Sequence, residues 1–141
     1  EERYSRRIAR AIVDARARAP LATTGQLAAI VRRAVPRGKR RIDPATRTFQ
    51  ALRIWVNREL EGLEEFVRSV SLRLRTGARL VVLTFHSLED RIVKYAFRKL
   101  QLDSDINMRV LTKRPLRPSS DEVSGNRRAR SAKLRAVERL P

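Results

Sequence analysis

The sequence contains no cysteine and only one histidine among its 141 residues. The absence of cysteine excludes disulfide bonds and thiolate metal ligands. A zinc site built from imidazoles needs several histidines, so the single His86 argues against one. No metal is therefore expected in the functional site of this chain.

Glycine is also scarce, with five residues that do not cluster. Neither GxGxxG nor GxxxxGK(S/T) occurs, so the chain encodes no dinucleotide-binding loop and no nucleotide-phosphate loop of these types. No apolar stretch approaches the roughly 20 residues of a membrane span, and nothing resembles a signal peptide. These absences predict a soluble, cytoplasmic protein with no membrane partner.

The composition is strongly basic, with 33 Lys and Arg against 15 Asp and Glu and a formal net charge of +18. No long helix combines a basic face with a Trp/Phe/Leu-rich face of the membrane-surface type. Nucleic acid is therefore the polyanionic partner that we expect. The length suits one modest domain or part of a larger one. Glu1, which already lies in a helical pattern, suggests a fragment of something longer.

The first third of the chain is predicted to be helical. Apolar residues recur at helical spacing over residues 2–18, and again after a capping box formed by Thr23 and Gln26. Pro36 closes this second helix and opens a basic loop, PRGKRR. Such a run is often only a solvated loop, but in a chain this basic we expect phosphate contacts from it. The residues concerned are Arg37, Lys39, Arg40 and Arg41.

A further helix is expected to start at Asp43, with Pro44 at its first helical position. Its apolar residues step by three and four, which predicts a well-packed helix. Trp55 lies beside these positions, and we interpret it as a core or half-buried residue rather than as a base-stacking platform. A second helical stretch, residues 63–74, ends before Gly77. The apolar series is Phe49, Leu52, Val56, Leu60 and Leu63.

The stretch from Leu80 to Leu100 organises the rest of the chain. Residues 80–85 form a short run rich in β-branched side chains, which predicts a strand buried on both faces. Ser87 and Asp90 have the form of a capping box that opens a helix. Ligands bind just outside the carboxyl ends of strands in open α/β sheets, so this turn is the first candidate site. Two interpretations of His86 stay open, packing against the sheet and a role beside a substrate.

Shorter elements follow this helix. A strand is predicted at residues 108–112, one helical turn is capped by Ser119 with Glu122, and a final strand is predicted at residues 134–140. The fold class is therefore α/β. Between the last two elements lies a second basic loop, NRRARSAK, which is the alternative location for an RNA-binding surface. Its candidate residues are Asn126, Arg127, Arg128, Arg130 and Lys133.

The run TFHSLEDRIVK, residues 84–94, closely resembles the (S/T)FHSLEDRIVK signature of the MraW family of ribosomal RNA small subunit methyltransferases. Four further stretches agree in the same order. They are EERYSRRIARAI (residues 1–12), TTGQL (23–27), PATRTFQALRIWVNREL (44–60) and NRRARSAKLR (126–135). The resemblance covers essentially the whole chain, but only the second half of the family.

The resemblance implies the C-terminal part of a class I, Rossmann-like methyltransferase with a helical domain inserted in its sheet. Residues 1–42 are then the end of the inserted, substrate-recognising helical domain, and residues 43–141 the C-terminal half of the catalytic domain. The three strands become the fifth, sixth and seventh of the sheet, with the last one antiparallel between the other two. The implied reaction is methylation of the exocyclic N4 of a cytidine in the decoding region of 16S rRNA.

The implied cofactor is S-adenosyl-L-methionine, and the implied partners are 16S rRNA in the small ribosomal subunit and the missing N-terminal half. The family motifs that bind the cofactor lie upstream of Glu1, so no cofactor ligand is assigned and the chain alone is expected to be inactive. By position, His86, Ser87 and Glu89 are the candidates near the target base, followed by Asn126 and Arg130. Two alternatives stay open: a catalytically incomplete rRNA-binding fragment and a ribosome-associated basic protein.

Overall fold

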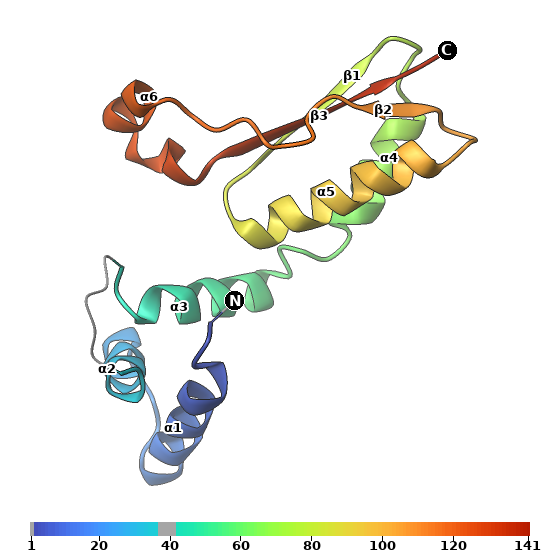
Figure 1. The fold of residues 1–141 in the computed structure, drawn as a ribbon. Helices are drawn as coiled ribbons and strands as arrows, with labels where there is room; N and C mark the ends of the chain where they lie inside the picture. The colour runs from blue at the N-terminus through green and yellow to red at the C-terminus, as the bar shows by residue number, and fades with distance from the viewer. Residues whose placement is uncertain (1, 37–41) are drawn as a thin grey trace. The chain divides into compact units, whose positions relative to one another are not determined.

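The computed structural model describes residues 2–36 and 42–141, which form two compact units (Figure 1). The first unit is Glu1–Glu59 and the second is Leu60–Pro141. The basic residues Arg37, Lys39, Arg40 and Arg41 lie outside the described residues, so their contact with phosphate stays a prediction. The domain division after residue 42, which the resemblance implies, also stays a prediction.

The first unit consists of α1 (Ser5–Arg18), α2 (Thr24–Ala34) and α3 (Ala45–Asn57). The predicted capping box of α2 is confirmed. Thr23 Oγ1 accepts a hydrogen bond from the Gln26 N–H at 3.2 Å, and Gln26 Oε1 accepts from the Thr23 N–H at 3.0 Å. The core of the unit is small and aliphatic, and its buried residues are Ile8, Ala28, Val31, Ala34, Val35 and Ala45.

α3 starts at Ala45 with Pro44 as its N-cap, one residue later than predicted, but the side chain of Asp43 still bonds to its first residue. Asp43 Oδ1 accepts a hydrogen bond from the Ala45 N–H at 2.8 Å, which satisfies a free donor at the start of α3. Arg32 of α2 donates to the same carboxylate, with Nη2 and Oδ2 2.6 Å apart. The hydrogen bonds from Arg32, followed by the one from Ala45, lower the pKa of Asp43. This residue therefore both bonds to the start of α3 and ties it to α2.

The remaining face of α3 is exposed, contrary to prediction. Trp55 is 79% exposed, and Leu52 and Val56 are exposed as well. Only the side of α3 that carries Ala45 and Phe49 packs on the core of the first unit. The helix thus meets its unit along one narrow stripe, and the expectation of a buried or half-buried Trp55 is wrong.

The second unit combines a three-stranded sheet with helices, which confirms the α/β class. The strands lie in the order β1-β3-β2, and β3 pairs antiparallel with both neighbours. The prediction that the last strand lies antiparallel between the other two is therefore confirmed. The elements are α4 (Leu63–Leu72), β1 (Arg79–Thr84), α5 (Ser87–Leu102), β2 (Met108–Val110), α6 (Ser120–Gly125), the short 3-10 helix η1 (Arg127–Ser131) and β3 (Lys133–Arg139).

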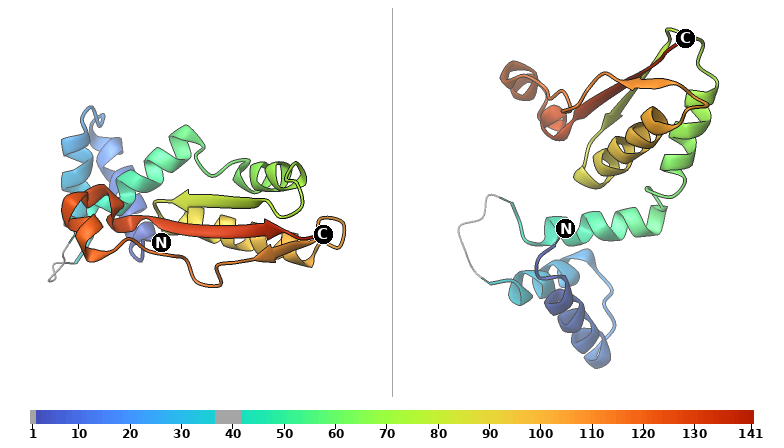
Figure 2. Two further views of the ribbon diagram at one scale, coloured as in Figure 1. Left: turned by 90° about the horizontal axis from the view of Figure 1, so that it is seen from above. Right: turned by 45° about the vertical axis from the view of Figure 1, so that its right-hand side comes forward.

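One face of this sheet carries the core of the unit. Leu80 pairs with Val137 and Val82 pairs with Arg135, so these side chains share a face. Figures 1 and 2 show α5 lying across that face, with α4 beside it. The fully buried Phe97 and Val93 of α5 pack there against Val137 and against Val67 of α4.

The opposite face of the sheet is open. Val81, Leu83 and Phe85 are 53%, 52% and 52% exposed. The prediction that β1 is buried on both faces is wrong for the described chain, because helices cover only one side of the sheet. A row of half-exposed apolar side chains on a regular strand is nevertheless unusual for a surface in contact with water.

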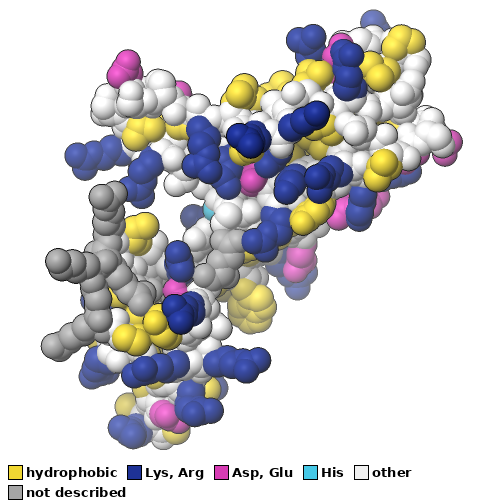
Figure 3. All heavy atoms as spheres, viewed as in Figure 1, with side chains coloured by type: hydrophobic (Ala, Val, Ile, Leu, Met, Phe, Trp, Pro, Cys, Tyr) yellow, Lys and Arg dark blue, Asp and Glu magenta, His cyan; other side chains and the backbone are white. Residues whose placement is uncertain are grey.

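On the face of the molecule drawn in Figure 3, basic side chains are spread out rather than gathered in one patch. On the face shown in Figure 3, Lys and Arg side chains occur over the elements of both units. Nucleic-acid binding through phosphate contacts is compatible with such a distribution, because phosphates repeat along the whole backbone.

Candidate functional site at the carboxyl end of β1

The turn between β1 and α5 is closed by a capping box that lies one residue earlier than predicted. His86, not Ser87, is the N-cap, and Glu89 takes the place predicted for Asp90. His86 Nδ1 accepts a hydrogen bond from the Glu89 N–H at 3.3 Å. Glu89 Oε2 accepts from the N–H groups of His86 at 3.2 Å and Phe85 at 2.9 Å. The proposed Ser87–Asp90 box is therefore wrong, and Asp90 is free for another role.

The imidazole of His86 is enclosed by this turn. The residue is 9% exposed, and its Nδ1 acts as an acceptor, so the neutral ring carries its proton on Nε2. Nε2 lies 3.3 Å from Glu89 Oε1 without the geometry of a hydrogen bond. These contacts favour the packing interpretation of His86. Its role beside a substrate, like those of Ser87 and Glu89, stays a prediction.

Replacing His86 with Ala is expected to lower the free energy of unfolding by about 1 to 2 kcal/mol, because the change removes the cap of α5. Urea unfolding of the whole chain, followed by circular dichroism, measures the effect. Arg98→Ala, an exposed position on the same helix, is the matched control. Equal unfolding midpoints for the two variants would show that the cap contributes nothing.

Asp90 forms a buried ion pair that joins α5 to β3. Its Oδ1 accepts from Arg135 Nε at 2.6 Å and its Oδ2 accepts from Arg135 Nη2 at 3.2 Å. Lys133 Nζ lies 3.4 Å from Oδ2. Burial alone has the largest single effect and raises the pKa of Asp90, but the hydrogen bonds and charges of Arg135 and Lys133 together outweigh it and lower that pKa. The carboxylate is therefore held in its charged form.

The ion pair with Asp90 also concerns Lys133, which is one of the residues predicted to contact RNA. The side chain of Lys133 is only 18% exposed and is directed to Asp90. Arg127, Arg128 and Arg130 are all exposed on η1, next to it in the chain. Contact of these four residues with RNA stays a prediction. Among their side chains, that of Lys133 alone has a hydrogen-bond or ion-pair partner within the described residues.

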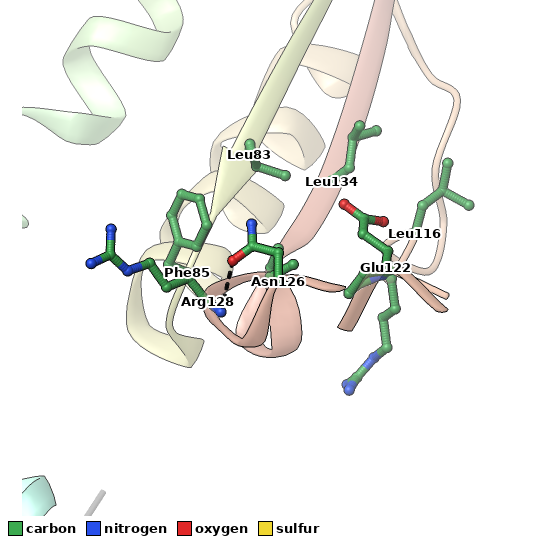
Figure 4. Close-up of a pocket in the computed structure, with 11 residues that line it drawn as sticks. Leu83, Phe85, Leu116, Glu122, Asn126, Arg128 and Leu134 are labelled. Carbon is green, nitrogen blue, oxygen red and sulfur yellow. Dashed lines mark hydrogen bonds between the residues drawn. The ribbon is translucent and has the colours of Figure 1, made fainter. Parts of the chain in front are cut away.

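A pocket of about 460 Å³ opens on the face of the sheet opposite α5, at the carboxyl end of β1. Figure 4 shows its floor formed by strand side chains, with Asn126 and Glu122 reaching toward them from the α6 and η1 segment. Asn126 caps η1, because its Oδ1 accepts from the Arg128 N–H at 3.1 Å. The lining residues are Leu83, Phe85, Leu116, Arg117, Pro118, Glu122, Asn126, Arg128, Ala129, Ala132 and Leu134.

The structure thus brings together only part of the predicted site. Asn126 and Arg128 line the pocket, whereas His86, Ser87 and Glu89 belong to the neighbouring turn and do not line it. Sequence reasoning missed Phe85, Glu122 and the Asp90–Arg135 pair. The sequence did contain a signal for the ion pair. Every second residue of a strand lies on the same face, so Arg135 shares a face with Val137. An arginine on a face that packs on the core needs an acidic partner.

Two negative findings narrow the chemistry of the described part of the chain. Within residues 2–36 and 42–141, no group of three or more His, Cys, Asp or Glu could hold a metal ion. Over the same ranges, no helix has the length and apolar character needed to cross a membrane.

Comparison with known proteins gives a consistent result. A model of the MraW methylase family matches residues 1–140. Ribosomal RNA small subunit methyltransferase H of Wolbachia pipientis wMel is 55% identical over 139 residues, which cover 99% of this chain and 44% of the relative. The protein of the same name from a Cyanothece species is 57% identical over 140 residues, which cover 99% of this chain and 45% of the relative. The one from Anaplasma marginale (strain Florida) is 51% identical over 140 residues, which cover 99% of this chain and 47% of the relative. The chain therefore spans less than half the length of these curated relatives.

Proposed function

Because the chain belongs to the MraW methylase family, we propose that it forms the C-terminal part of an S-adenosylmethionine-dependent methyltransferase acting on N4 of a cytidine in the decoding region of 16S rRNA. The observation that carries this proposal is the family match over residues 1–140. In the proposal, residues 1–42 end the inserted recognition domain and residues 43–141 complete the catalytic domain. The partner is the small ribosomal subunit in the cytoplasm.

The open sheet supports a role as one part of a larger catalytic domain. β1 is an edge strand of the described sheet, and its uncovered face carries Val81, Leu83 and Phe85. The curated relatives are about twice as long as this chain. We propose that the remaining half of the full-length protein adds a strand beside β1 and covers this apolar face.

In the proposal, the cofactor site lies mainly outside the described residues. A nucleoside-containing cofactor of this kind needs a backbone loop without side chains and a carboxylate for its ribose hydroxyls. Two carboxylates close to the end of β1 are already engaged, Glu89 by its own turn and Asp90 by Arg135. In the proposal, the cofactor site therefore belongs mainly to the remaining half of the protein.

An rRNA-binding module without catalysis is the second candidate, and a ribosome-associated basic protein is the third. The net charge of +18 and the three exposed arginines of η1 favour RNA binding in either case. RNA binding by this chain is therefore common to all three candidates. Methyl transfer by the completed protein separates the first from the other two.

Binding to a decoding-region fragment of 16S rRNA is expected to weaken steeply with salt. Changing Arg127, Arg128 and Arg130 together to Gln should reduce the slope of log affinity against log salt by about 2, since each phosphate contact contributes about 0.7 to 0.9. Fluorescence anisotropy at several salt concentrations measures the slope.

The matched control removes the same charge elsewhere, as Arg75→Gln, Arg98→Gln and Arg114→Gln, and is expected to change the slope less. A parallel variant with Arg37, Lys39, Arg40 and Arg41 changed to Gln tests the other basic loop and is expected to flatten the slope as well. Unchanged slopes for both the η1 and the loop variants would remove the RNA surface from both segments.

A further inference from the structure

An apolar stripe runs along α3 and is uncovered toward the end of the helix. Leu52, Trp55 and Val56 are 39%, 79% and 69% exposed, and residues three and four positions apart are neighbours on a helix. Ala45 and Phe49 precede them on the same stripe and pack on the core of the first unit. The stripe therefore continues past that core, and its second part has no cover among the described residues.

The polar groups of α3 lie on its other side and are engaged within the first unit. Arg53 Nε donates to Glu59 Oε1 at 2.8 Å, and Asn57 Nδ2 donates to the same oxygen at 3.1 Å. The side of the apolar stripe is completed by Thr48 and Ala51, so it carries no charge. Such a surface suits a dry contact with other apolar side chains, and it offers nothing to the phosphates of RNA.

The uncovered part of the stripe is too small to hold a separate partner protein. A specific interface buries about 800 Å² on each partner. Three partly exposed side chains provide less than this area, because even a fully buried aromatic side chain contributes only about 150 to 250 Å². A segment of the same polypeptide needs less area, since the covalent link gives it a high effective concentration. The occupant that fits is therefore another part of the same protein.

The beginning of the chain lies beside α3. Glu2 Oε2 is 3.9 Å from Arg47 Nη1, and both residues line one pocket together with Tyr4. In the proposed function the remaining half precedes residue 1, and the curated relatives are about twice as long as this chain. The remaining half therefore joins the first unit next to α3.

We propose that the remaining half of the protein packs on Leu52, Trp55 and Val56, in a contact separate from the one proposed at β1. The inference rests on the proposed function for the existence and position of that half. It gives α3 two sets of apolar contacts, with the core of the first unit at its start and with the remaining half at its end. α3 would then connect the helical first unit to the rest of the protein.

Trp55→Ala combined with Val56→Ala tests this contact in two forms of the protein. In the chain alone both side chains are exposed, so the thermal unfolding midpoint, followed by circular dichroism, should change by less than about 2 °C. In the completed protein the same change removes packed side chains and should lower the midpoint by about 5 °C or more. Thr46→Ala, an exposed position on the polar side of α3, is the control that should change neither midpoint.

Fluorescence of the protein without this double change covers the case in which the double variant of the completed protein does not fold. Trp55 is the single tryptophan of the chain, so quenching by acrylamide reports its exposure directly. In the chain alone it should be quenched as readily as N-acetyltryptophanamide. In the completed protein its signal is the difference from the Trp55→Phe variant, and it should be protected like a buried indole.

Ready quenching of Trp55 in the completed protein, or an unchanged midpoint of its double variant, would overturn the inference. Protection of Trp55 in the chain alone that grows with protein concentration would overturn it too, because a second copy would be the occupant. Protection that appears only on addition of RNA would do the same. An active completed protein with an exposed Trp55 would refute this contact and keep the proposed function, whereas an inactive one with a protected Trp55 would do the reverse.

Discussion

Replacing Asp90 with Asn is expected to lower the free energy of unfolding by about 3 kcal/mol or more, because breaking a buried ion pair leaves an uncompensated charge. The stranded charge is Arg135, which is 5% exposed and donates twice to the Asp90 carboxylate. An amide in place of the carboxylate cannot accept both bonds and carries no charge. Urea unfolding of the whole chain, followed by circular dichroism, measures the loss.

The matched control is Glu138→Gln. Glu138 pairs with Arg109 at 2.9 Å on the open side of the sheet, and the Arg109 side chain is 59% exposed, against 6% for that of Arg135. The cation left by Glu138→Gln therefore stays in contact with water, so the loss of this pair should matter far less. The double change Asp90→Leu with Arg135→Met removes both charges and is expected to recover much of the stability. Equal unfolding midpoints for Asp90→Asn and Glu138→Gln would contradict the structural role of the buried pair.

The same pair predicts a loss of stability in acid. The pKa of Asp90 is lowered in the folded state, because the attraction of Arg135 and Lys133 outweighs the effect of burial. Its contribution is therefore complete above the pKa of an unfolded aspartate, about 3.9, and is lost as the pH falls through the lower folded value. This part of the acid sensitivity should be absent from Asp90→Asn.

Local patterns predicted most of the elements correctly. The Thr23–Gln26 capping box, a side-chain hydrogen bond to Asp43 at the start of α3 and the strand order with β3 in the centre are all confirmed. The first two depend on residues within a few positions of one another, so the sequence itself contains their cause. The third came from the resemblance to a family and not from spacing.

The start of α5 shows where local patterns fail. Two overlapping boxes are possible, Ser87 with Asp90 and His86 with Glu89, and both fit the spacing of a cap. The choice depends on where β1 ends and on what Asp90 contacts. Asp90 meets Arg135, which is 45 positions away in the chain, and only the strand pairing brings the two together.

Burial was harder to predict than secondary structure, as Trp55 and Phe85 show. The apolar run at β1 was interpreted as a strand covered on both faces, yet its outer side chains are half exposed. A sequence pattern reports how much apolar surface must be covered, not which part of a protein covers it. The pocket has the same origin, because the strand register alone places Leu83 beside Leu134.

Joining the chain to its missing half is expected to create methyltransferase activity that the chain alone lacks. In the proposal the cofactor site lies mainly in the other half of the protein, so the isolated chain should transfer no methyl group above background. The completed protein gains the cofactor site and a cover for the open face of β1, and its thermal unfolding midpoint should rise as well. Arg98→Ala in the completed protein is the control that should retain activity.

The decisive measurement is transfer of tritiated methyl groups from S-adenosylmethionine to small ribosomal subunits that lack the modification, with the modified nucleoside identified by mass spectrometry. The completed protein is expected to produce N4-methylcytidine in 16S rRNA, and the isolated chain none. No transfer by a completed protein that is folded and binds the cofactor would contradict the methyltransferase function and leave RNA binding as the role of this chain.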